Sequence, residues 1–250
     1  ETEVLPLLRQ RFNLTGVIKS RVLRTCGIGE SAVDARIDDL MHLSNPTVGT
    51  RAHPGQTDVV ITAKADSAVE ADALIAPVEQ ALRQRLGLYV FGVDQETLSD
   101  VLTDLLAARG LRLSVAETVT RGELAKALSS AHQGAKALAG AVMLPNVESA
   151  RQVLGIGAAA EAQGFVSQEA ADAAAEAVRR LYGADLGLAI MGPDDPGTPG
   201  APPVYFTLAT EAGLVRGEPR PGRAGVVGLN WLLYLGQDLV RRQLLGAESN

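Results

Sequence analysis

Hydrophobic and polar positions in the first third of the chain follow two different periods, which predicts a small mixed α/β module. Residues 17–23 alternate between two faces, as a half-buried strand does. Two further apolar segments flank the turn sequence HPGQ and are typical of a hairpin. Apolar residues at helical spacing follow each of these features. The predicted order is β-α-β-β-α, with strands at 17–23, 47–52 and 58–65 and helices at 30–43 and 68–86.

The pattern changes after residues 87–93, where we expect a domain boundary. Asp94 has the chemistry of a helix N-cap and precedes apolar residues at helical spacing, which end before Gly110. Short apolar strands then alternate with helices, which predicts an α/β sandwich. The expected strands are 111–116, 139–144, 185–191 and 204–209, and the expected helices are 147–154, 168–182 and 223–245. Residues 193–203 are too rich in Pro and Gly for regular structure and are predicted to be a binding loop.

The second domain contains one junction with clear chemical potential, residues 111–124. An apolar strand passes through Glu117, Thr118 and Thr120 into a predicted helix. The N-terminus of a helix has unpaired N–H groups and a positive dipole end, so this junction is a candidate anion or oxyanion site. The alternative is that Thr118 or Thr120 serves only as an N-cap.

Composition narrows the functional classes further. The chain has 250 residues, a net charge of -6 and no apolar run long enough for a membrane helix, so we expect a soluble, cytoplasmic protein. Neither half has the concentrated basic residues that non-specific nucleic-acid binding requires, so nucleic acid is not an expected partner. Cys26 is the only cysteine and has no nearby histidine, which favours an inert thiol. The three histidines are scattered, so neither a metal nor a cofactor is expected.

The motifs of the second domain resemble those of the C-terminal domain of the CinA family. AETVTRG (116–122), MLPNVESARQVLGIG (143–157) and LAIMGPDDPGTPGAPP (188–203) parallel the family patterns AESCTGG, GGVVAYSNEAK leading to LLGV, and AVTGIAGPGGGTPEKPVG. Residues 13–90, including TGVIKSRVLRTCGIGES, resemble the KH-like module of that family. The resemblance implies three parts: residues 1–12 as the tail of a missing molybdopterin-binding-like N-terminal domain, 13–90 as a KH-like linker module, and 91–250 as an amidase-like domain.

The resemblance also implies a reaction, because catalytic members of this family hydrolyse the amide of nicotinamide mononucleotide. A hydroxyl nucleophile attacks the carboxamide, a Lys and a Tyr handle its proton, and helix N–H groups stabilise the oxyanion. By position, the nucleophile falls on Thr118, with Glu117 beside it as a candidate base. Ligand contacts are implied at Thr120, Gly122 and Gly192 of these motifs and at Arg223, which matches a family Arg near the last helix.

Several positions depart from the family pattern. Leu144 or Pro145 replaces the family Tyr, and Ala150 replaces the family Lys. The adjacent Arg151 is a poor general base. Three further replacements affect the expected ligand region: Arg121 stands for a Gly, Met191 for a Thr, and Asp194 with Asp195 for part of a Gly-rich loop where a phosphate is expected.

Two functions follow from this comparison. The first is a catalytically degenerate domain that serves as a scaffold for a homodimer or another partner. The second is an active nicotinamide-nucleotide amidase in which Thr118 attacks, with Glu117 or a residue of a second subunit as base. The KH-like module is expected to be an architectural linker, because residues 26–30 (CGIGE) lack a GxxG loop and include Glu30. A nucleotide is the possible small-molecule ligand.

Overall fold

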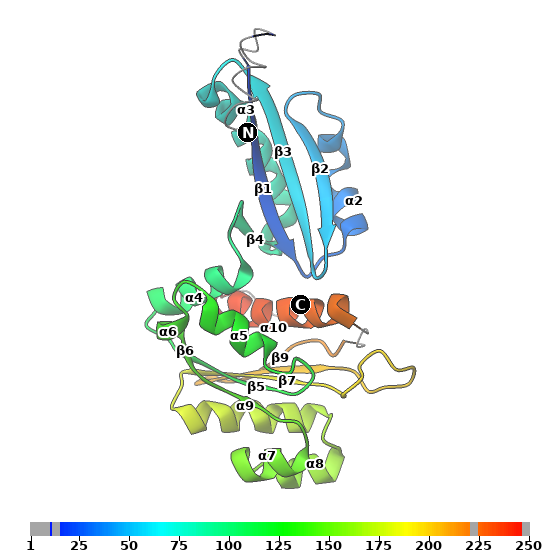
Figure 1. Cartoon of the computed structure of the whole chain (residues 1–250), viewed down its shortest axis with the longest axis vertical. Helices are drawn as coiled ribbons and strands as arrows, with labels where there is room; N and C mark the ends of the chain where they lie inside the picture. Colours follow the sequence, from blue (N-terminus) through cyan, green and yellow to red (C-terminus); the bar gives the residue numbers. More distant parts are fainter. Residues whose placement is uncertain (1–10, 12–15, 221–224, 247–250) are drawn as a thin grey trace. The chain divides into compact units, whose positions relative to one another are not determined.

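The computed structural model describes residue 11, residues 16–220 and residues 225–246. The chain divides into two compact units, Glu1–Gln95 and Glu96–Asn250. Each unit has its own sheet and its own hydrophobic core (Figure 1). The structure confirms the predicted fold class, a small α+β module followed by an α/β sandwich.

The first unit is an antiparallel sheet with two helices packed on one of its faces (Figure 1). The strand order is β2-β3-β1-β4. Val59, Ile61 and Ala63 of β3 alternate into the core, because successive side chains of a strand point to opposite faces, and β1 adds Leu23. The elements are β1 (Val17–Cys26), α2 (Glu30–Met41), β2 (Thr47–His53), β3 (Gln56–Ala65), α3 (Ala68–Leu86), the 3₁₀ helix η1 (Gly87–Tyr89) and β4 (Val90–Val93).

Residues 87–93, where we expected a domain boundary, form the 3₁₀ helix η1 and the strand β4. The helix that follows, α4, begins later than predicted. β4 pairs antiparallel with β1. The prediction of Asp94 as an N-cap was wrong: Asp94 has a positive φ of 51°, and its carboxylate accepts hydrogen bonds from the backbone N–H of Val22 at 3.0 Å and from Arg21. Helix α4 (Leu98–Ala108) is instead capped by Thr97, whose side chain accepts from the N–H of Asp100 at 3.1 Å.

The second unit is a five-stranded sheet between two layers of helices (Figure 1). The strand order is β6-β5-β7-β8-β9, with β5 parallel to both of its neighbours and β8 and β9 antiparallel. Helices α4, α5 and α10 lie on one face, and α7, α8 and α9 on the other. Its elements after α4 are β5 (Leu113–Glu117), α5 (Glu123–Ser130), α6 (Gly134–Ala137), β6 (Leu138–Met143), α7 (Val147–Leu154), α8 (Gly157–Gln163), α9 (Gln168–Tyr182), β7 (Leu186–Met191), β8 (Tyr205–Thr210), β9 (Gly213–Arg216) and α10 (Gly225–Leu244).

The central strand β7 shows why this sheet is covered on both faces. All six of its residues are buried. Leu188 and Ile190 pack into the cluster on the α10 face, whereas Ala189 and Met191 pack into the Ala-rich cluster on the α9 face. A strand buried on both faces is a continuous apolar run. The sequence predicted this strand, but it did not predict β9, α6 or α8.

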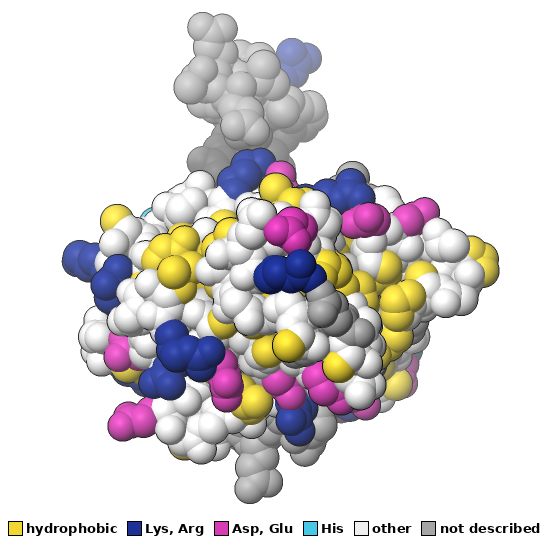
Figure 2. Space-filling model, turned by 90° about the horizontal axis from the view of Figure 1, so that it is seen from below, with side chains coloured by type: hydrophobic (Ala, Val, Ile, Leu, Met, Phe, Trp, Pro, Cys, Tyr) yellow, Lys and Arg dark blue, Asp and Glu magenta, His cyan; other side chains and the backbone are white. Residues whose placement is uncertain are grey.

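Charged side chains on the outer helices are mostly paired with one another. On α7, Arg151 lies 3.4 Å from Glu148, and on α9, Arg180 lies 3.5 Å from Glu176. Figure 2, which views the molecule from the side of these helices, shows Lys and Arg interspersed with Asp and Glu. This face therefore has no broad surface of a single charge. Within the described part of the chain, no helix is long and apolar enough to cross a membrane.

One polar network joins α9 to the two antiparallel strands at the edge of the sheet. Asp172 accepts hydrogen bonds from Gln168 at 2.9 Å, from the Thr207 hydroxyl at 2.8 Å, and from Arg216 Nε at 3.0 Å and Nη2 at 2.7 Å. Burial acts to raise the pKa of Asp172, but the hydrogen bonds from Arg216, Gln168 and Thr207 outweigh it and hold the pKa below its ordinary value.

We predict that Asp172→Asn lowers the free energy of unfolding by about 0.5–1.5 kcal/mol at pH 7, because the partly buried carboxylate loses its charge-assisted hydrogen bonds, of which those from the exposed Arg216 are weakened by solvent. A carboxyl with a lowered pKa in the folded state stabilises that state above its unfolded pKa. The difference between wild type and variant should therefore be complete above about pH 4 and should shrink as the pH falls through the lowered pKa of Asp172. Urea denaturation at pH 7 and pH 3 measures both effects.

The matched control is Glu176→Gln on the same helix, because Glu176 forms only an exposed ion pair. It should change stability by less than about 0.5 kcal/mol. A gap between wild type and Asp172→Asn that is equally large at pH 3 and pH 7 would contradict the assignment of the effect to the Asp172 charge.

Candidate functional site

The junction between β5 and α5 has an unusual backbone. Arg121 and Gly122 both have a positive φ, 51° and 88° respectively. Glycine adopts this region freely, but for other residues it costs about 1 kcal/mol or more. Gly122 is the N-cap residue of α5, which begins at Glu123. The expected strand-to-helix junction is therefore present, and its turn has the conformation of a glycine pair.

The Glu117 carboxylate is buried beneath this turn and occupies the start of α5. Its Oε2 accepts from the Thr120 hydroxyl at 2.6 Å and from the N–H of Leu124 at 3.3 Å, and its Oε1 accepts from the N–H of Ala125 at 3.1 Å. The N–H of Glu123 donates to the Thr120 carbonyl at 2.9 Å. The first three helical N–H groups of α5 thus have internal partners, and a carboxylate of the chain itself satisfies two of them.

Thr118 points toward the adjacent strand β7. Its Oγ1 accepts a hydrogen bond from the N–H of Gly192 at 2.8 Å. The same hydroxyl can donate to the carbonyl of Gly192 at 3.0 Å or of Ile190 at 3.4 Å. The residue is only 8% exposed. Among the described residues, every partner of this hydroxyl is a backbone group of β7 or of the residue that follows it.

The remaining predicted ligand residues are close in space but have structural contacts. Thr120 is fully buried against Glu117. Gly192 lies so near its neighbours that a Cβ there would be 2.8 Å from Val119 Cγ1. Arg223, the last predicted ligand residue, lies outside the described residues. The structure therefore brings Glu117, Thr118, Thr120 and Gly192 together around the end of β5.

The positions where the family pattern has its Tyr, Lys and Thr lie in one apolar cluster. Leu144, Ala150 and Met191 are each 0% exposed, and all three belong to the Ala-rich cluster beneath the α9 face of the sheet. The alternative Tyr position, Pro145, is exposed. Tyr205 was not predicted from the sequence. It pairs with Met191 across β7 and β8 and packs against the same cluster. The motif at residues 188–203 does not show that β8 pairs with β7.

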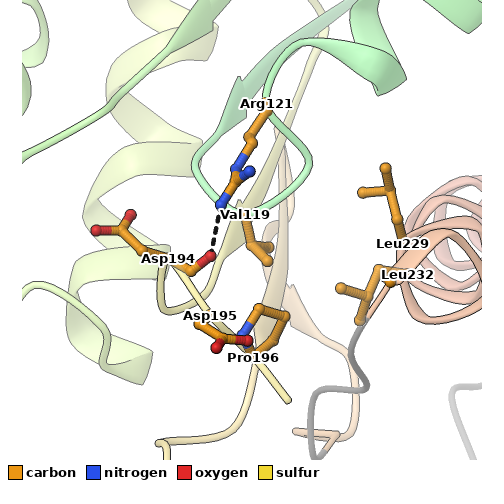
Figure 3. Close-up of a pocket in the computed structure, with 8 residues that line it drawn as sticks. Val119, Arg121, Asp194, Asp195, Pro196, Leu229 and Leu232 are labelled. Carbon is orange, nitrogen blue, oxygen red and sulfur yellow. Dashed lines mark hydrogen bonds between the residues drawn. The ribbon is translucent and has the colours of Figure 1, made fainter. Parts of the chain in front are cut away.

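A cavity of about 530 Å³ lies on the opposite, α10 side of the same strand ends. Its lining comes from the β5–α5 turn, the Pro-rich loop and the first turns of α10 (Figure 3). The lining residues include Val119, Arg121, Asp194, Asp195, Leu229 and Leu232. None of the described residues predicted to be catalytic or ligand-binding lines this cavity. Three residues of the loop at 193–203 line this cavity, and its role as a binding loop stays a prediction.

Asp194 and Asp195, the two carboxylates that the sequence placed in the expected ligand region, differ in their surroundings. Arg121 Nη2 donates to the backbone carbonyl of Asp194 at 2.6 Å, and the Asp194 carboxylate points away from Arg121 (Figure 3). The Asp195 carboxylate accepts from the N–H of Gly197 at 3.2 Å and from the Thr198 hydroxyl at 2.9 Å within its own loop. The loop therefore uses one of its two carboxylates to form its own turn.

Among the described residues, no group of three His, Cys, Asp or Glu side chains is placed to hold a metal ion. His53 lies 3.1 Å from the buried Asp58, in the first unit. Cys26 is also in the first unit and is buried.

Two family models match the chain in succession. The model for the damage-inducible protein CinA KH domain matches residues 20–92, and the model for the CinA C-terminal domain matches residues 95–217. A putative competence-damage inducible protein of Moorella thermoacetica is 39% identical over 196 residues, which is 78% of this chain and 47% of that protein. A CinA-like protein of Frankia casuarinae is 37% identical over 256 residues, which is 99% of this chain and 59% of that protein. The chain thus spans about half the length of the curated relatives it matches.

Solved structures described as CinA superfamily proteins share the fold over more than half of this chain. A CinA superfamily protein from Klebsiella pneumoniae has a TM-score of 0.53 at 24% identity, covering 60% of this chain and 96% of its own. Another from Escherichia coli has a TM-score of 0.51 at 23% identity, covering 64% and 98% respectively.

We predict that Glu117→Gln lowers the free energy of unfolding by about 1.5–3 kcal/mol, because a charged acceptor of two helix N–H groups is replaced by a neutral amide with only one acceptor oxygen. Chemical denaturation monitored by circular dichroism measures the change. The control is Glu123→Gln in the first turn of the same helix, since Glu123 is partly exposed and pairs with Lys126. Equal stability of the two variants would show that the Glu117 carboxylate does not hold α5 in place.

Proposed function

The chain belongs to the CinA family, and on that premise we propose that its second unit keeps the family fold without the amidase chemistry and acts as a scaffold for a homodimer or another partner. The observation that carries this proposal is the hydrogen bonding of Thr118. A nucleophilic hydroxyl needs a base to receive its proton and an open path to the substrate. The Thr118 hydroxyl faces backbone carbonyls, which are not bases at physiological pH, and it is almost fully buried.

The surroundings of Thr118 support the same proposal. Leu144, Ala150 and Met191 fill the corresponding positions with buried aliphatic side chains, none of which can accept or donate a proton. Glu117, the candidate base in the enzymatic alternative, already accepts three hydrogen bonds at the start of α5. Losing one proton-transfer group typically costs about 10²- to 10⁴-fold in rate. Losing both the Lys and the Tyr removes the proton path.

We predict that the chain does not convert nicotinamide mononucleotide to nicotinic acid mononucleotide and ammonia above the rate measured without protein. Thr118→Ser, which restores the family nucleophile, should not produce turnover either, because the proton-transfer groups are still absent. Chromatographic detection of the acid product together with an ammonia assay measures both.

Turnover in the wild type that Thr118→Ala abolishes would contradict the proposal and support the amidase alternative. Tyr205→Phe is an informative companion variant, because Tyr205 is the tyrosine that β8 brings beside Met191. Turnover that depends on the Tyr205 hydroxyl would identify a relocated proton-transfer group. Circular dichroism of each variant separates loss of chemistry from loss of fold.

The dimer in this proposal is argued from α10. Val227 of this helix is a large apolar side chain that is 55% exposed. Trp231 and Tyr234 are half-buried and have partners in the structure, and Leu232 and Leu239 are buried in the core of the unit itself. Val227 is therefore the residue that we propose for the contact with a second chain.

We predict that the chain elutes as a dimer, with a mass by light scattering of twice 26.1 kDa. Val227→Glu should shift the equilibrium toward the monomer by about 10-fold or more, since a charge would be buried in the interface. Gln243→Glu, an exposed position near the end of the same helix, is the control and should leave the dimer unchanged. A monomeric mass at high protein concentration would remove the dimer from the proposal.

A further inference from the structure

Most cations of the second unit form an ion pair within the chain, and the exceptions gather mainly at one end of its sheet. The paired residues are Lys126, Arg151, Arg180, Arg216, Arg220, Arg241 and Arg242. The cations of this unit that have no carboxylate partner in the described part of the chain are Arg109, Arg112, Arg121, Lys136 and Arg179. All of these except Arg121 lie where β5, β6 and β7 begin, at the end of the sheet opposite the Pro-rich loop (Figure 1).

Hydrogen bonds bring the segments of this end together. Arg112 directly precedes β5, and its N–H donates to the Asp185 carboxylate at 2.8 Å. Arg179, near the end of α9, donates from Nε to the Asp185 carbonyl at 2.8 Å. Lys136 lies on α6, directly before β6, the strand that pairs with β5. These cations come from three separate segments and form one surface, which we call the basic end (Arg109, Arg112, Lys136 and Arg179).

The basic end keeps its positive charge. Arg112 and Lys136 are exposed, and no other described residue bonds either side chain. Arg109 and Arg179 each donate to two backbone carbonyls, which hold the guanidinium in place without neutralising it. The cations outnumber the carboxylates that contact them, although the chain as a whole has a net charge of -6. Local positive charge on an acidic protein favours a negatively charged partner.

A small cavity of about 200 Å³ adjoins the basic end. Its lining includes Glu176, Arg179 and Arg180 of α9 and Thr210 and Gly213 of the β8–β9 hairpin. Cofactors and drug-sized ligands need about 300–1,000 Å³, so this volume suits one inserted side chain. Arg180 pairs with Glu176 at 3.5 Å, and both side chains are more than half exposed, so this ion pair is weak and can be exchanged. A carboxylate of a partner fits between the two guanidinium groups.

The surroundings favour a protein segment over a nucleic acid as the partner. Leu181 follows Arg180 and is 49% exposed, which places an apolar contact next to the cations. Single-stranded nucleic acids use aromatic rings for stacking. Tyr182 packs against Gly140 and donates its hydroxyl to the Ala141 carbonyl at 3.0 Å, so its ring is occupied within the fold. Acidic and apolar side chains in one segment match this surface best.

We propose that the basic end is a docking surface for an acidic protein segment, and that one carboxylate side chain of this segment enters the cavity between Arg179 and Arg180. Arg112 and Lys136 attract the other carboxylates, and Leu181 contacts an apolar residue of the segment. The inference rests on the proposed scaffold function and names the chemistry of a partner for it.

The test measures fluorescence anisotropy of a labelled peptide of repeated Glu-Glu-Leu units with the whole chain. A Gln-Gln-Leu peptide of the same length and a labelled oligothymidylate are the comparison probes. We expect the Glu peptide to bind about 10-fold or more tightly than the Gln peptide, and its affinity should fall as salt is added.

The double variant Arg112→Gln with Lys136→Gln should weaken binding of the Glu peptide about 5- to 10-fold, since two exposed charge pairs are lost. The matched control, Lys126→Gln with Arg151→Gln, removes the same net charge from exposed ion pairs elsewhere. It should change the affinity less than about 2-fold. Circular dichroism confirms that both double variants are folded.

Glu176→Gln is the decisive single variant, because it removes the carboxylate that competes for Arg180. It should tighten binding of the Glu peptide about 3-fold, a gain that damage to the fold cannot produce. Arg180→Gln should weaken it by a similar factor. Glu123→Gln, which makes the same change of net charge on α5, should have no effect.

Four results would overturn the proposal: no binding of the Glu peptide, equal affinity for the Glu and Gln peptides, equal losses in the two double variants, or equal affinities of Glu176→Gln and wild type. Tighter binding of oligothymidylate than of the Glu peptide would also overturn it and would identify a nucleic-acid surface instead. Val227→Glu should bind the Glu peptide as wild type does. Loss of the dimer, amidase turnover and loss of this contact are therefore separate outcomes.

Discussion

The second unit depends on the hydrogen bonds made by two consecutive side chains at the end of β5. Glu117 is the last residue of β5 and Thr118 is the first residue after it, and their side chains bond different elements. Glu117 is directed to α5 and accepts the N–H groups of Leu124 and Ala125, while Thr118 is directed to β7 and bonds the backbone of Gly192. Together they fix the helix and the neighbouring strand relative to β5.

In the proposed function, this arrangement allows the family fold to persist without the amidase chemistry. A helix N-terminus and a nearby hydroxyl are the elements from which an oxyanion site and a nucleophile are built. Here both are used to stabilise the fold. The turn still has the backbone of a glycine pair, with a positive φ at Arg121 as well as at Gly122. The geometry is therefore that of the family pattern, but the side chains have changed around it.

The substitutions also act together in space, which the sequence shows only as separate departures. Leu144, Ala150 and Met191 come from three different segments and meet in one buried cluster. An aliphatic side chain among other aliphatic side chains needs no hydrogen-bond partner, whereas an isolated Lys or Tyr there would need one. Replacing one of these residues alone by its family counterpart would bury an unpartnered polar group.

The sequence predicted the fold well where it depends on local periodicity. The boundaries of α3, α7 and α9 match the predicted helices, because each has a clear apolar stripe and recognisable caps. The predictions were less complete for strands that form only by pairing with another strand. β4 pairs with β1, and β9 pairs with β8.

The same limit applies to the site. The motif located the junction at Thr118, but the partners of its hydroxyl come from β7, more than 70 residues away. The Glu117 carboxylate likewise reaches N–H groups seven and eight positions later, a contact that exists only once the turn has formed. The cavity lies on the other face of the sheet, and its lining comes from segments that no single motif joins.

The structural role of the Thr118 hydroxyl, which bonds the backbone of Gly192, can be tested by a crystal structure of the chain soaked with nicotinamide mononucleotide. We expect Thr118 Oγ1 to stay within hydrogen-bond distance of the Gly192 N–H, with no Lys or Tyr side chain of either copy near it. A carboxamide carbon in contact with that oxygen, and a Lys or Tyr positioned to take its proton, would show that the hydroxyl is a nucleophile instead.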